Sequence, residues 1–134
     1  MYAEHLKTVV TGVDGAIACA IMGFDGITVD THQAPAAQEA AAQLELSNAW
    51  VEFANLLSQL RNVADTLKTG AVAELSVNTE KCLTLMRMVT PEYFLVLGLL
   101  PGGNYGKARY VLRIDGKSDR IAADRSDFTV SSRA

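Results

Sequence analysis

The chain has 134 residues, of which 49% are hydrophobic and 20% are charged, and it contains only 3 prolines. This length and balance predict one folded domain and exclude a disordered, collagen-like or two-domain protein. The formal net charge of −3 argues against a nucleic-acid-binding domain, because such domains normally present a basic face to the phosphates.

The first part of the chain predicts a helix followed by a β-hairpin. Apolar residues at helical spacing indicate a helix over residues 2–11, which Gly12 ends. Residues 16–22 form an apolar run typical of a central strand, and residues 27–31 alternate in the manner of an edge strand. The Asp25-Gly26 dipeptide between them favours a tight turn, because glycine accepts a positive φ, so we expect the two strands to form a hairpin.

A long helix is predicted over residues 36–68, which contain no glycine and no proline. Pro35 stands where a first helical residue belongs and Gly70 follows the end, although two helices with a break near Ser47 and Asn48 are an alternative. Its apolar residues recur at alternating spacings of 4 and 3, at Leu46, Trp50, Phe53, Leu57, Leu60, Ala64 and Leu67. At about 1.5 Å per residue such a helix is roughly twice as long as a five-stranded sheet is wide. The helix therefore either bends or buries its surplus apolar face against a second copy of the chain.

Three strands and a final helix are predicted for the rest of the chain. The strands are expected at residues 71–77, 82–89 and 93–100. The turns between them are short enough to require antiparallel neighbours, and the third strand is apolar on both faces, so we expect it in the middle of the sheet. A surface helix is expected over residues 105–115, with its continuation to Ile121 left open. We expect a domain over residues 1–123 and a flexible tail over residues 124–134.

The sequence contains no sign of a membrane or secretory segment. The longest strongly apolar run, residues 93–100, is far shorter than the roughly 20 residues that a membrane-spanning helix needs. Residues 1–5 show neither the basic segment nor the apolar core of a secretory signal. We therefore expect a cytoplasmic protein.

The sequence offers no constellation of catalytic or metal-binding residues. His5 and His32 belong to no zinc or nucleophile motif and stand at the ends of predicted elements, where a solvated histidine is usual. Cys19 and Cys82 lie in apolar runs, which favours buried thiols. The glycines of residues 102–107 invite comparison with a phosphate-binding loop, but a strand-to-helix turn explains them better, because the flanking residues do not match that motif. We predict no catalytic residue, no cofactor and no metal.

The surface offers two candidate binding regions. Phe24 and Ile27 flank the hairpin turn, whose tip is exposed by geometry, and Asp25 lies between them. Alternatively, Phe24 folds back over the long helix and Asp25 caps its own turn. Residues 107–134 carry 7 basic and 4 acidic side chains, against 5 and 11 in residues 1–106. This basic segment indicates either a solvated helix face or a docking patch for an acidic partner.

Three segments of the chain resemble motifs of one protein family. They are Val-Asp-Gly-Ala-Ile-Ala-Cys-Ala at residues 13–20, Gly-Phe-Asp-Gly-Ile-Thr-Val at residues 23–29 and Gly-Asn-Tyr-Gly-Lys-Ala-Arg at residues 103–109. In this order they are similar to the opening strand, the hairpin and the entry to the last helix of the roadblock/dynein light-chain family. Within it the chain resembles the bacterial polarity proteins of the MglB and MglC kind, and residues 22–27 favour the MglC type.

The resemblance implies an α/β fold in the order α-β-β-α-β-β-β-α, with a five-stranded antiparallel sheet of strand order 2-1-5-4-3. A long helix covers one face, and two subunits join their third strands into the continuous sheet of a homodimer. The dimer interface is then expected on the long helix and the third strand, at Trp50, Phe53, Leu57, Leu60, Val72 and Leu75.

The resemblance also implies a non-enzymatic platform that binds a Ras-like small GTPase or another roadblock protein. One hypothesis is therefore an adaptor in a small-GTPase polarity circuit, with the hairpin tip as its contact to a partner roadblock protein. A second is direct activation of the GTPase, through the long-helix face or through Arg109 and Arg113. A third is a small hotdog-type enzyme, which is weakened because Glu39 alone stands where a catalytic carboxylate is needed.

Overall fold

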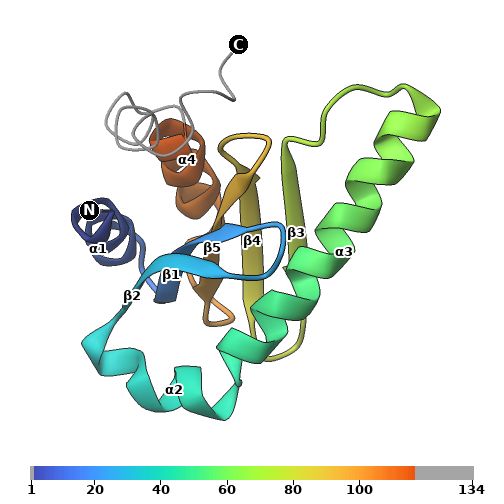
Figure 1. Ribbon diagram of the computed structural model, residues 1–134. Coiled ribbons are helices and arrows are strands. Elements are labelled where there is room, and N and C mark those ends of the chain that lie inside the picture. The colour runs from blue at the N-terminus through green and yellow to red at the C-terminus, as the bar shows by residue number, and fades with distance from the viewer. Residues whose placement is uncertain (1, 117–134) are drawn as a thin grey trace.

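The structure, a computed structural model, describes residues 2–116 of the chain. Its elements follow the predicted order (Figure 1): α1 (Ala3–Gly12), β1 (Ala16–Gly23), β2 (Thr28–Gln33), η1 (Pro35–Ala37), α2 (Gln38–Gln43), α3 (Leu46–Leu67), β3 (Glu74–Asn78), β4 (Leu83–Met88), β5 (Tyr93–Leu99) and α4 (Tyr105–Gly116). The predicted continuation of the last helix to Ile121 and the predicted tail over residues 124–134 lie outside the described residues. Among residues 2–116, no helix combines the length and the hydropathy that crossing a bilayer requires.

A five-stranded antiparallel sheet forms the middle layer of the fold, with the strand order β2-β1-β5-β4-β3. This is the order that the resemblance implied. Figure 1 shows α1 and α4 on one face of the sheet and α2 and α3 on the other. β5 is buried almost throughout, because it lies between β1 and β4 and under both helical layers. The predicted central position of this strand is confirmed.

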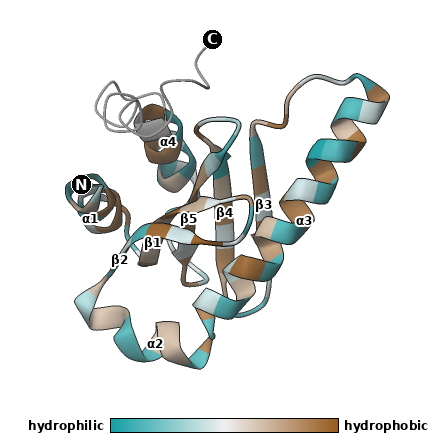
Figure 2. Ribbon diagram, viewed as in Figure 1, coloured by the Kyte–Doolittle hydropathy of each residue, from teal (hydrophilic) through white to brown (hydrophobic). Residues whose placement is uncertain are grey.

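Side chains of the sheet alternate between two hydrophobic cores, one on each face. On β1, Cys19 and Ile21 belong to the core under α1 and α4, whereas Ala18, Ala20 and Met22 belong to the core under α2 and α3. Hydrophobic residues recur along α3 as far as its C-terminal end (Figure 2). The row of hydrophobic residues on α3 thus continues beyond the part of the helix that the sheet covers.

The long helical segment is divided at Leu44 and Glu45, between α2 and α3. Glu45 has a φ of 48°, a left-handed conformation that stops one helix and starts the next in a new direction. The alternative of two helices is confirmed, but the expected break near Ser47 and Asn48 is wrong, because both residues lie inside α3. At its other end α3 is closed by Lys68, which also takes a left-handed conformation, with a φ of 57°.

Candidate partner-binding site

The turn between β1 and β2 is held by hydrogen bonds among its own residues. The amide of Gly26 donates to the carbonyl of Gly23 at 3.0 Å, and the amide of Gly23 donates to the carbonyl of Ile27 at 2.9 Å. Asp25 Oδ1 accepts the amide of Ile27 at 3.0 Å. Gly26 takes a φ of 86°, which glycine adopts without a Cβ clash. Asp25 therefore caps its own turn, and the hairpin tip has a defined shape.

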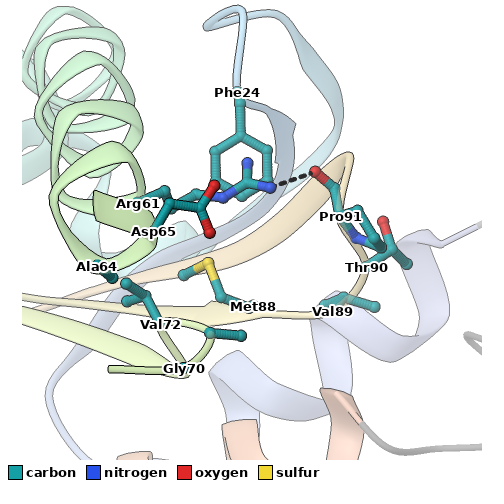
Figure 3. A pocket seen from close by; sticks show the side chains of 11 residues that line it. Phe24, Arg61, Ala64, Asp65, Gly70, Val72, Met88, Val89, Thr90 and Pro91 are labelled. Atoms are coloured by element: carbon teal, nitrogen blue, oxygen red, sulfur yellow. Dashed lines mark hydrogen bonds between the residues drawn. The ribbon is translucent and has the colours of Figure 1, made fainter. Parts of the chain in front are cut away.

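Phe24 folds back from this turn onto the body of the domain. Its ring centroid lies 5.1 Å from that of Phe94, at an interplanar angle of 49°. The guanidinium carbon of Arg61 lies 3.9 Å from the Phe24 centroid, and Arg61 Nη2 donates to the carbonyl of Pro91 at 3.0 Å (Figure 3). The Phe24 carbonyl in turn accepts Ser58 Oγ at 3.4 Å. Phe24 is thus half-buried, and it ties the hairpin to α3 instead of projecting from the tip.

A pocket of about 350 Å³ lies beside Phe24 and Arg61, between the C-terminal half of α3 and the turn that joins β4 to β5 (Figure 3). Most of the other lining residues are apolar: Ala64, Ala71, Val72, Met88, Val89 and Pro91. Asp65 and Thr90 are polar residues of the lining, and Arg61 adds a positive charge to the pocket. Such a lining suits an apolar side chain of a partner better than a phosphate-bearing cofactor, which needs several convergent donors.

Two of the candidate catalytic or metal-binding residues, Cys19 and His32, are opposite each other in the register of β1 and β2. Among residues 2–116, no three His, Cys, Asp or Glu side chains lie close enough to hold a metal ion. The thiols of Cys19 and Cys82 are buried, as predicted. His5 is buried as well, because it lies on the face of α1 that packs onto the sheet, so the expectation of a solvated His5 is wrong. Glu39 is exposed on α2 and accepts a hydrogen bond from Gln43 at 3.2 Å, one helical turn away.

Solved structures of other proteins have a similar fold. No family model matches the chain, and no curated protein matches it. The Roadblock/LC7 domain from Streptomyces avermitilis covers 90% of this chain and 96% of its own, with 15% identity and a TM-score of 0.72. The gliding protein MglB from Thermus thermophilus covers 90% of this chain and 87% of its own, with 17% identity and a TM-score of 0.76. These two structures share the fold.

A much stronger sequence similarity is found with MglC from Myxococcus xanthus. That structure is 56% identical to this chain, covers 92% of it and 98% of the MglC chain, and has a TM-score of 0.64. The chain belongs to the roadblock family. The identity also bears out the leaning toward MglC, since the MglB structure is only 17% identical.

In this roadblock protein, the residues expected at a dimer interface lie in different environments. Trp50 and Leu57 are buried in the subunit's own core under α3, so they offer no surface to a second copy in this structure. The other expected interface residues are half-buried: Phe53, Leu60, Val72 and Leu75. The exposed apolar face of α3 consists of Leu56, Val63 and Leu67, which recur at helical spacing on one side of the helix. Val51 is also exposed but lies on another side of α3, beside Gly26 of the hairpin turn. One side of the apolar stripe therefore packs on the sheet, and the other faces outward.

Replacing Phe24 with alanine is expected to lower the free energy of unfolding by about 2 kcal/mol, because the smaller side chain loses its contacts with Phe94 and Arg61. Urea unfolding followed by circular dichroism measures the change. Ile27→Ala is the matched control, since Ile27 is 66% exposed and its loss is expected to cost no more than about 0.5 kcal/mol. Equal unfolding midpoints for the two variants would contradict the packed position of Phe24.

Proposed function

We propose that this roadblock protein is a non-enzymatic, homodimeric and cytoplasmic adaptor in a bacterial polarity and motility circuit. It regulates a Ras-like small GTPase by binding a second roadblock protein that activates the GTPase. The 56% identity to MglC from Myxococcus xanthus supports an adaptor of the MglC type. MglB from Thermus thermophilus, which shares the fold, is itself described as a gliding protein.

The observation that carries the proposal is the hairpin tip, where Ile27 is exposed next to a turn that is held by its own hydrogen bonds. Asp25 and Gly26 define the turn, and Phe24 ties it to α3, so the Ile27 side chain is presented at one place. A partner that binds a preordered side chain does not have to order it first, which lowers the entropic cost of association. The exposed Asp25 beside it adds a negative charge to the contact. We propose Phe24, Asp25 and Ile27 as the partner-binding residues.

The exposed apolar face of α3 supports the homodimer. Apolar surface of this kind on a single subunit marks an interaction site. β3, the neighbouring edge of the sheet, has a strand partner on one side only within the described chain. Pairing of two β3 edges would cover this backbone and bring the two α3 helices together. Phe53, Leu60, Val72 and Leu75 then lie at or beside the interface.

Direct activation of the GTPase, the second hypothesis, has less support from the geometry. Arg109 and Arg113 lie on α4, on the opposite face of the sheet from α3 (Figure 1). A GTPase bound to the α3 face therefore does not reach either arginine, so the two candidate surfaces do not act together on one GTPase. In addition, Arg109 Nε donates to Glu74 Oε2 at 2.9 Å, whereas an arginine that stabilises phosphoryl transfer has to reach the transferred phosphate.

Replacing Ile27 with alanine is expected to weaken binding of the partner roadblock protein by about 1–3 kcal/mol, the usual effect of truncating an interface hot spot. Titration calorimetry with a roadblock protein encoded beside this chain measures the affinity. Leu100→Ala is the matched control, because Leu100 is also exposed but follows β5 at the end of the sheet away from the hairpin. This variant is expected to bind like the unmodified protein, and an unchanged affinity for Ile27→Ala would remove the hairpin from the interface.

Size-exclusion chromatography with light scattering separates the two hypotheses. The protein alone is expected to elute as a dimer, and to shift with the roadblock partner but not with the small GTPase in its GTP-bound form. A shift with the GTPase alone would reject the adaptor and favour a direct regulator. A monomer under all conditions would reject the homodimer.

A further inference from the structure

We infer that a groove between α4 and the β3–β4 edge of the sheet binds an acidic segment of a partner protein. The groove has a volume of about 180 Å³ and is lined by Glu74, Arg87, Gly106, Arg109, Tyr110 and Arg113. It lies on the α4 face of the sheet, whereas the pocket beside Phe24 and Arg61 lies on the α3 face. The groove is therefore a second surface, separate from the hairpin contact proposed above.

Two strands and one helix bring the charged side chains together. Glu74 on β3 and Arg87 on β4 are directly opposite in the antiparallel register, so their side chains share one face of the sheet. Arg87 Nη1 lies 3.5 Å from Glu74 Oε1, and Arg109 Nε donates to Glu74 Oε2 at 2.9 Å. One carboxylate thus holds two guanidinium groups in place from opposite sides of the groove. Arg113, one turn beyond Arg109 on α4, adds a third.

The groove has an excess of positive charge and of hydrogen-bond donors. It contains three guanidinium groups and one carboxylate, in a chain whose net charge is −3. A guanidinium carries five N–H donors, and Arg87 and Arg109 each direct one of them to Glu74. Within the described residues, no carboxylate lies within ion-pair distance of Arg113. The remaining donors match the bidentate geometry of carboxylates.

Two of the arginine side chains are already held in place, and this favours a peptide as the occupant. Because Glu74 already holds Arg87 and Arg109, a ligand does not pay the full entropic cost of ordering them. Tyr110 is 57% exposed beside the groove, with the Arg113 guanidinium 5.7 Å from its ring centroid, and Ile114 is exposed one turn later. Tyrosine and arginine are among the residues enriched in protein–protein hot spots. A segment with several carboxylates and an apolar side chain complements this surface.

Other anionic occupants fit less well. A nucleic acid needs a long track of cations, whereas this groove offers three and places the Glu74 carboxylate among them. The chain's own residues 117–134 carry 4 basic and 3 acidic side chains, so they do not supply the complementary charge. An acidic partner segment is the occupant that the charges support.

The test uses the full chain and a short fluorescent peptide of alternating glutamate and leucine, with binding followed by fluorescence anisotropy. The peptide is expected to bind, to dissociate as salt is added, and to bind better than a peptide with lysine in place of glutamate. Arg113→Gln is expected to weaken binding about tenfold or more, the factor that corresponds to one lost hydrogen bond between charged groups. Arg113 makes no ion pair in the described chain, so this variant is expected to fold normally.

Lys107→Gln is the matched control, with the same change of charge on the same helix at a residue that does not line the groove. It is expected to change the affinity by less than about twofold, as is usual for an exposed charge. The inference is overturned when the glutamate peptide fails to bind, when Arg113→Gln and Lys107→Gln bind alike, or when single-stranded RNA displaces the peptide and binds more tightly. Both variants keep the hairpin, so a failure here leaves the adaptor proposal intact.

Discussion

Replacing Leu57 with aspartate is expected to unfold the protein. Leu57 is fully buried between α3 and the sheet, where its side chain packs in the same core as Trp50 and Ala54. Loss of the leucine side chain alone costs about 2–5 kcal/mol, and an unpaired buried carboxylate adds a further penalty. The total is comparable to the whole stability of a domain of this size, about 5–15 kcal/mol. Circular dichroism is expected to show the loss of helix and strand signals at room temperature.

The neighbouring Leu56→Asp variant is the matched control. Leu56 is 41% exposed on the outward face of α3, so the same charge is placed in water and the fold is expected to remain. Under the homodimer proposal, this variant is expected to elute as a folded monomer in light scattering. A folded Leu57→Asp variant would contradict the placement of Leu57 in the core, and a dimeric Leu56→Asp variant would remove Leu56 from the dimer interface.

Replacing Gly15 with alanine is expected to lower the free energy of unfolding by about 3 kcal/mol. Gly15 has a φ of 84°, and a Cβ at this position would lie 2.7 Å from the Cα of Gly103. Its carbonyl accepts the amide of Leu100 at 2.8 Å, so the turn after α1 and the turn before α4 are joined here. The left-handed conformation costs about 1–2 kcal/mol for an L residue, and separation of the two turns adds to it. Urea unfolding measures the loss.

Gly12→Ala provides the control for this change. A Cβ at Gly12 meets nothing within 4 Å, and Gly12 belongs to α1, where alanine is favoured over glycine by up to about 1 kcal/mol. This variant is expected to be as stable as the unmodified protein or slightly more stable. Should Gly15→Ala behave in the same way, the two turns would not be packed as closely as the structure places them.

The secondary structure could be predicted because the signals that form it are local. The Asp25-Gly26 turn and the unbroken apolar run of β5 are both readable from a few adjacent residues. The strand order came from the family resemblance alone, since the pairing of Cys19 with Leu97 joins residues that are distant in the sequence. The break at Glu45 had no local signal, because a left-handed glutamate runs against the preference of that residue.

The candidate site was predictable only at its outermost residue. Ile27 follows a tight turn, and its exposure follows from that position. The position of Phe24 depends on Arg61 and Phe94, which no sequence spacing connects to the hairpin. The periodicity of α3 identified an apolar stripe, but it did not show which residues of the stripe the sheet covers. Trp50 was therefore expected at the dimer interface, whereas in the structure it lies in the core. The arginine groove likewise joins three separate elements.

The two edges of the sheet differ in a way that bears on polymerisation. On β2, Asp30 pairs with Ile21 of β1 and Thr28 pairs with Met22, which leaves Val29 as an extra residue in the ladder. A bulge of this kind bends a strand and makes a poor template for another chain. β3 has an uninterrupted register from Glu74 to Asn78. Molecules that join through β3 alone form a closed two-fold pair with irregular strands outermost, so growth into filaments stops at the first step.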